Sequence, residues 1–124
     1  MIETPLSFET VLGSGAITVF DTTRDVIDIV HRTMQFFSEE SCGLCTPCRE
    51  GSEVMVEIYA RLAAGDGVPE DIAALERLAL LMRQSSLCGL GQAASIPVTD
   101  SLTHFRGDYE TRIKQSVFLK KLYR

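Results

Sequence analysis

The sequence has no long apolar run and no surplus of basic residues, and both absences limit what the protein does. No apolar stretch among its 124 residues approaches the roughly twenty needed to cross a bilayer, so no transmembrane segment is expected. The N-terminus lacks the basic region and apolar core of a signal peptide, which predicts a cytoplasmic protein or one at the periphery of a membrane complex. A formal net charge of -5 argues against nucleic-acid binding, which needs a basic face to neutralise phosphates.

Catalytic motifs are also missing. The two histidines, His31 and His104, lie on expected helices, and no acid or nucleophile stands at a spacing that would indicate a catalytic triad. There is no paired-carboxylate site and no phosphate loop. Gly13-Ser14-Gly15 precedes a strand instead of opening a helix, which is the wrong order for a dinucleotide-binding loop. We therefore expect no complete active site, and no residues for FMN or NAD, in this chain.

Only one segment has the pattern of a β-strand. Residues 15–20 are rich in β-branched side chains and end at Asp21, and no later segment offers a convincing second strand. A single strand cannot satisfy its own backbone groups. We therefore expect residues 1–21 to be an N-terminal extension whose short strand pairs with a partner or an upstream domain, or is poorly ordered.

The rest of the chain has helical periodicity. Apolar residues recur every three or four positions from Val26 onward, which is typical of helices with one buried face. Thr46-Pro47 has threonine as a cap and proline at the first helical position, and Pro69 starts another helix after a glycine-rich break. The expected helices cover residues 24–38, 47–64, 69–85 and 97–115. The predicted fold is mainly α, a four-helix bundle-like domain over residues 22–118 followed by a basic tail at 119–124.

The four cysteines indicate one metal site. Cys42, Cys45 and Cys48 form a C-x-x-C-x-x-C run, and Cys88 follows much later in the chain. A [4Fe-4S] cluster needs four thiolates that converge on one small object, and gaps of two residues let a single loop supply three of them. The sequence therefore predicts one [4Fe-4S] cluster at one end of the helical domain, with these four cysteines as its ligands.

Other uses of the cysteines fit the spacing less well. Disulfides would need two pairs, yet closely spaced cysteines compete with one another, and nothing marks the chain as secreted. Plant-type [2Fe-2S] sites have a four-residue gap, and the bacterial ferredoxin run places its fourth cysteine just downstream, followed by proline. Structural zinc usually takes two separated pairs of ligands. Zinc remains the main alternative metal, and a chain held together by zinc or by a purely structural cluster would be an interaction domain without a redox role.

A helical hairpin explains how Cys88 reaches the other three cysteines. The two expected helices between Cys48 and Cys88 have about equal lengths, roughly seventeen residues each, or about 25 Å at 1.5 Å per residue. An antiparallel hairpin with equal arms returns its end to the level of its start. We therefore expect Cys88 to lie beside the triplet.

Residues next to the cysteines are expected to tune the cluster. The free N–H groups and the dipole at the start of helix 47–64 favour the reduced state. Arg49 would add a positive charge, and the hydroxyls of Ser41 and Thr46 would donate to sulfur, each raising the reduction potential. The simpler alternatives are a surface salt bridge for Arg49 and helix capping for Thr46. The glycines that either allow close backbone approach or only form turns are Gly43, Gly89 and Gly91.

Two segments resemble a known module. Residues 40–51, ESCGLCTPCREG, and residues 87–98, LCGLGQAASIPV, are similar to the C-terminal iron–sulfur domain of the NADH-binding flavoprotein subunit of respiratory complex I. Related domains occur in the diaphorase subunits of NAD-linked hydrogenases and formate dehydrogenases. The resemblance implies a helical domain whose single [4Fe-4S] cluster takes electrons from FMN, after NADH has reduced the flavin, and passes them to further clusters. It implies the same four cysteine ligands.

The resemblance also implies partners. In that family the FMN and NADH sites lie in a preceding domain, so both cofactors are expected on a partner chain or a missing domain, with other iron–sulfur subunits as further partners. The chain is then an electron-transfer module of an NAD-linked oxidoreductase. Leu44 stands where many relatives have lysine, and Gln92 where many have aspartate. Because the first difference removes a positive charge, we expect a reduction potential below the family norm.

Overall fold

The protein folds into helices, as the mainly α prediction requires. The computed structural model describes residues 16–122, except the side chains of residues 116, 117 and 119–122. The predicted N-terminal extension therefore lies outside the described residues up to residue 15, and so do residues 123–124 of the predicted tail. The helices are α1 (Val26–Glu39), α2 (Thr46–Ala63), α3 (Pro69–Ser85), α4 (Gly89–Ala93), α5 (Ser95–His104) and α6 (Arg106–Leu122).

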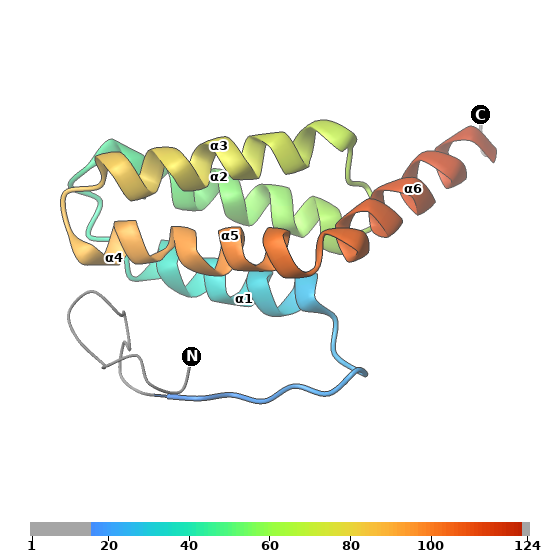
Figure 1. Ribbon diagram of the computed structural model, residues 1–124. Coiled ribbons are helices and arrows are strands. Elements are labelled where there is room, and N and C mark those ends of the chain that lie inside the picture. The colour runs from blue at the N-terminus through green and yellow to red at the C-terminus, as the bar shows by residue number, and fades with distance from the viewer. Residues whose placement is uncertain (1–15, 123–124) are drawn as a thin grey trace.

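Four of the helices enclose the core. Helix α1 packs on α2, α2 on α3, α3 on α5, and α5 back on α1. Figure 1 shows α2 and α3 as an antiparallel pair, with α6 leaving the domain at the end opposite to α4. Each packed helix contributes an apolar stripe, and burial of these stripes is the main stabilising term. The core is formed by residues such as Met34, Met55, Leu62, Leu75, Met82 and Val98.

Local signals explain the start of α1 and the turn after α2. Asp25 is the N-cap of α1, and its carboxylate accepts a hydrogen bond of 2.8 Å from the N–H of Ile27. After α2 the chain turns through Gly65, whose φ of +78° favours glycine. Asp71, which is buried in the first turn of α3, accepts the N–H of Val68 and pairs with Arg61 of α2. This contact ties the two helices together at the turn.

The expected helix over 97–115 is wrong, because the structure has two helices there. Helix α5 ends at His104, and Phe105 has φ -127° and ψ 25°, outside the helical region. The apolar stripe continues across this break to Tyr109 and Ile113, which are both buried, so the sequence pattern hides the interruption. Phe105 itself is half-exposed instead of contributing to the core. The short helix α4 was also not expected.

The strand expected at 15–20 does not form in its described part. Residues 16–20 have no regular secondary structure, and the side chains of Ile17 and Val19 are each 89% exposed. The described residues contain no strand, so no partner strand for this segment lies within them.

A buried network of hydroxyl groups attaches α6 to the rest of the core. The Tyr109 hydroxyl lies 3.0 Å from that of Tyr59 in α2 and 2.8 Å from that of Ser101 in α5. Ser101 in turn donates to the carbonyl of Val98. Burial raises the pKa of both tyrosines, so both stay protonated and able to donate.

We expect the two tyrosines to differ in their contribution to stability. Tyr109→Phe should lower the free energy of unfolding by about 1–3 kcal/mol, because it removes the hydroxyl that bonds to both Tyr59 and Ser101 inside the core. Tyr59→Phe should cost about 1 kcal/mol, since Tyr109 keeps Ser101 as a partner. Denaturant unfolding of both single variants and the double variant would check this. Costs that add fully in the double variant would contradict the shared hydrogen bond.

Candidate metal centre

Cys42 and Cys45 lie on the loop that joins α1 to α2, and Cys48 lies in the first turn of α2. The loop is short because α1 ends at Glu39 and α2 begins at Thr46. Gly43 has φ +72°, a conformation that a residue with a side chain rarely adopts, and it turns the loop between Cys42 and Cys45. The thiol of Cys42 is exposed, that of Cys45 is half-buried and that of Cys48 is buried. All three thiols are free.

Cys45, rather than Thr46, is the N-cap of α2. Cys45 has extended backbone angles, and no side-chain hydrogen bond caps the helix, so the predicted capping role of Thr46 is wrong. Thr46 is the first residue of α2 and is exposed, and Pro47 is the second. The N–H groups of Leu87 and Cys48 lie close enough to Cys45 to lower the pKa of its thiol, and Leu87 contributes more.

The predicted antiparallel hairpin forms from α2 and α3, and Cys88 follows its second arm. Helices α2 and α3 have 18 and 17 residues, so the chain comes back to its starting level before Cys88. Cys88 is exposed and is the N-cap of α4. Its neighbour Leu87 reaches Cys45 through its N–H group. The starts of α2 and α4 therefore lie together at one end of the domain (Figure 1).

Gly91 is the point of closest approach between α4 and α2. A Cβ on Gly91 would lie 3.0 Å from the Cβ of Cys48 and 2.6 Å from the hydroxyl oxygen of Ser86. The expectation of close backbone approach thus holds at Gly91. At Gly89 a Cβ would have no protein neighbour within 4 Å, so its expected role stays a prediction.

Of the polar residues expected beside the cysteines, Ser41 contacts a cysteine sulfur, whereas Arg49 bonds to the loop backbone and to a neighbouring acid. The Ser41 hydroxyl lies 3.4 Å from the sulfur of Cys48, which fits the expected donation to sulfur. Arg49 donates to the carbonyl of Gly43 at 2.7 Å and pairs with Glu50 at 2.8 Å. Arg49 therefore braces the cysteine loop, and the surface salt bridge considered for it also forms.

Comparison with known proteins agrees with the geometry. Residues 28–112 match the protein family described as the NADH-ubiquinone oxidoreductase-F iron–sulfur binding region. The chain belongs to this family. NADH dehydrogenase [ubiquinone] flavoprotein 1, mitochondrial, from Dictyostelium discoideum is 40% identical over 110 residues, which cover 89% of this chain and 23% of that protein.

Other relatives of this iron–sulfur binding region show the same partial coverage. A subunit of the NADH-quinone oxidoreductase of Mycobacterium bovis is 40% identical over 119 residues, 91% of this chain and 27% of that protein. The crystal structure of an NAD+-reducing [NiFe]-hydrogenase in the H2-reduced state superposes with a TM-score of 0.80 at 40% identity, over 88% of this chain and 19% of that chain. The chain therefore spans about a quarter or less of the length of these relatives.

The donors present suit an iron–sulfur cluster. In the described part of the chain, no three His, Cys, Asp or Glu side chains are grouped closely enough to hold one metal ion. Zinc holds each sulfur at about 2.3 Å from one atom, whereas the thiolates of a [4Fe-4S] cluster each bind a different iron and so stand farther apart. Four free thiols with backbone N–H groups beside them fit the iron–sulfur binding that the family description states.

Two residues of this iron–sulfur binding region gain a role only in the structure. The Gln92 side chain donates to the carbonyl of Ser86 at 3.1 Å and so ties α4 to the end of α3. Aspartate, which many relatives have at this position, could not donate this hydrogen bond when ionised. Ser86 is 5% exposed, yet its hydroxyl has no hydrogen-bond partner. Nothing in the sequence singles out Ser86 except its nearness to Cys88.

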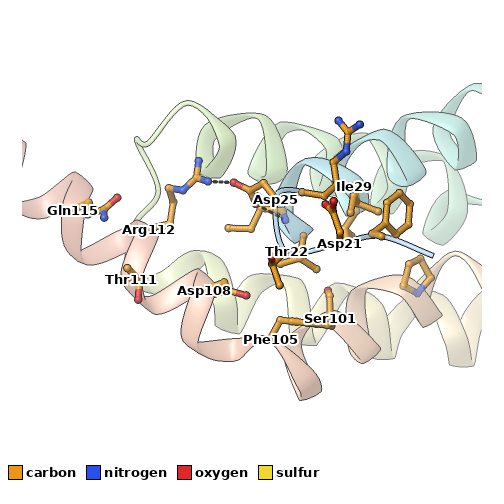
Figure 2. Close-up of a pocket in the computed structure, with 16 residues that line it drawn as sticks. Asp21, Thr22, Asp25, Ile29, Ser101, Phe105, Asp108, Thr111, Arg112 and Gln115 are labelled. Carbon is orange, nitrogen blue, oxygen red and sulfur yellow. Dashed lines mark hydrogen bonds and ion pairs between the residues drawn. The ribbon is translucent and has the colours of Figure 1, made fainter. Parts of the chain in front are cut away.

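A pocket elsewhere on the molecule contains none of the cysteines. It lies where the chain enters α1, against α5 and α6, and Figure 2 shows the ion pair between Asp25 and Arg112 at its wall. Arg112 also donates to the carbonyl of Ala63 at the end of α2. This pocket is therefore at the end of the domain away from the metal centre.

No helix in the described part of the chain is long and apolar enough to cross a membrane.

Proposed function

We propose that this chain is the electron-transfer module of an NAD-linked oxidoreductase, with one [4Fe-4S] cluster bound by Cys42, Cys45, Cys48 and Cys88. The observation that supports this most is geometric: the chain after α3 returns to the start of α2, where a Cβ on Gly91 would lie 3.0 Å from the Cβ of Cys48. Membership of the iron–sulfur binding family supports it independently. In this proposal the helical domain is a bundle that carries its cluster at one end.

The residues around the cysteines have separate tasks in this proposal. The cluster, when bound, supplies a centre that takes up and releases one electron at a time. The loop before α2 presents the thiolates of Cys42 and Cys45, the first turn of α2 presents that of Cys48, and the N-cap position of α4 presents that of Cys88. The N–H groups near Cys45 and the positive end of the α2 dipole stabilise added negative charge, so they favour the reduced state. Ser41, beside the Cys48 sulfur, acts in the same direction.

The flavin and nucleotide cofactors would be held by other parts of the enzyme. The relatives named as NADH dehydrogenase and NAD+-reducing hydrogenase are four to five times longer than the matched region. We propose that a flavin- and NAD-binding subunit or domain supplies electrons to this module and that another iron–sulfur subunit accepts them. The exposed apolar side chains of Ile17 and Val19, ahead of α1, suit a contact with such a unit.

The decisive experiment is anaerobic purification with iron, sulfide and zinc analysis. We expect four irons and four acid-labile sulfides per chain, brown colour, and an EPR signal that appears on reduction. Stoichiometric zinc without iron would refute the proposal and indicate a structural interaction domain. A cluster that no reductant within the physiological range can reduce would also refute the redox role.

Leu44→Lys should raise the reduction potential of the cluster. Leu44 is 79% exposed beside Cys45, so the added ammonium would be solvated and its attraction for the reduced cluster partly screened. We expect an upward shift of up to about 40 mV, which corresponds to about 1 kcal/mol of charge interaction. EPR-monitored redox titration at low and high salt would measure it. Phe118→Lys adds the same charge on α6, away from the cysteines, and should leave the potential unchanged; no rise in Leu44→Lys would contradict the expectation.

A further inference from the structure

Ser86 carries a buried hydroxyl that the protein itself leaves without a partner. Ser86 is the C-cap of α3, and only 5% of its surface is exposed. Its backbone groups are both used: the N–H donates to the carbonyl of Met82 at 3.1 Å, and the carbonyl accepts from Gln92 at 3.1 Å. Only the side-chain oxygen lacks a hydrogen bond. A buried hydroxyl without a partner costs about 1–3 kcal/mol, so such a group calls for an explanation.

The position of this hydroxyl links it to the cysteines. The Ser86 oxygen and the Cβ of Cys48 lie 2.6 Å and 3.0 Å from the same point, the place where a Cβ on Gly91 would be. Both atoms therefore flank the backbone of Gly91, at the contact between the starts of α2 and α4. Ser86 also lies two residues before Cys88 in the chain.

The other buried serines of the domain differ from Ser86. The Ser95 hydroxyl donates to the carbonyl of Gln92 at 2.7 Å, the Ser52 hydroxyl to that of Cys48 at 2.7 Å, and the Ser101 hydroxyl to that of Val98 at 3.0 Å. These three serines bond to backbone carbonyls three or four residues earlier in the chain, as serine commonly does. Ser86 lies outside a helix, in extended backbone, and has no such acceptor.

We propose that the Ser86 hydroxyl donates a hydrogen bond to a sulfur of the bound iron–sulfur cluster and thereby raises its reduction potential. This inference rests on the proposed function, because it needs the cluster that the four cysteines would hold. Sulfur in a neutral thiol is a weak acceptor, but the sulfurs of a cluster carry negative charge that grows on reduction. A hydroxyl donor therefore stabilises the reduced state more than the oxidised state.

The test compares Ser86→Ala with wild type by EPR-monitored redox titration of the cluster-loaded protein. At a fixed ambient potential we expect the ratio of reduced to oxidised cluster to fall by about three- to tenfold, a tenfold fall being about 59 mV for a one-electron couple. Ser86→Thr, which keeps the hydroxyl, should restore the wild-type potential. Ser95→Ala is the matched control, since its hydroxyl is already bonded within the protein, and it should not change the potential.

A second readout separates hydrogen bonding from a change in packing. Proton ENDOR spectra of the reduced cluster in H2O and D2O should show one exchangeable proton in wild type that is missing in Ser86→Ala. If the alanine variant does not take up a full cluster, Ser86→Gly, which also lacks the hydroxyl and adds no volume, replaces it. A hydroxyl-free variant with the wild-type potential and all exchangeable protons would overturn this inference alone. Wild-type protein that binds no iron would overturn the proposed function instead.

Discussion

Cys88→Ala is expected to abolish stable binding of a four-iron cluster while the helices stay folded. The variant leaves the three thiolates of Cys42, Cys45 and Cys48, and no other Cys or His is present in the sequence near position 88 to replace the fourth. Because Cys88 is exposed, removing its sulfur creates no cavity in the core. Iron and sulfide content should fall well below four of each per chain, and the EPR signal of the reduced [4Fe-4S] cluster should disappear.

Two comparisons make the Cys88 experiment specific. Leu87→Ala, at the adjacent exposed position, keeps the backbone N–H that reaches Cys45 and should bind the full cluster. Cys48→Ala should lose the cluster as well, but it also removes a buried side chain and should unfold more easily than Cys88→Ala. Full iron and sulfide content in Cys88→Ala would mean that Cys88 is not a ligand.

Gly91→Ala is expected to damage the metal centre without touching a thiol. The new Cβ would lie 2.6 Å from the hydroxyl oxygen and 2.7 Å from the Cβ of Ser86, and 3.0 Å from the Cβ of Cys48. The two Cβ atoms are attached directly to the backbone and cannot rotate away, so α4 must shift. Overpacking of this kind costs about 1–3 kcal/mol. The shift also moves Cys88 relative to Cys48, so cluster content should fall together with stability.

The same short helix offers a matched control for Gly91. A Cβ on Gly89 would meet nothing within 4 Å, and alanine favours helix over glycine by about 1 kcal/mol. Gly89→Ala should therefore keep both cluster content and the midpoint of thermal unfolding. The comparison uses iron and sulfide analysis together with unfolding of the loaded proteins. Equal behaviour of the two variants would show that the close approach at Gly91 does not matter.

The helical content and the candidate ligands could be predicted from the sequence for local reasons. Periodic apolar residues predict helices because each helix must bury one face, and α1, α2 and α3 begin and end within two residues of the expected positions. The break at Phe105 could not be predicted, because the apolar residues on both sides keep the same periodicity. Nor could the strand expected at 15–20 be settled, because a strand depends on a partner that residues 16–122 do not contain.

By itself, the sequence predicted that four thiols act together, through a spacing that a short segment and a hairpin of equal arms can bring to one place. Only the tertiary structure decided how that place is built. It puts Gly91 against Cys48, the N–H of Leu87 beside Cys45, and a partnerless hydroxyl at Ser86 between the two helix starts. The spacing of residues in the sequence reports only on local structure, such as a turn or the length of a helix. Contacts between residues some forty positions apart depend instead on how α2, α3 and α4 pack, and no local pattern encodes that packing.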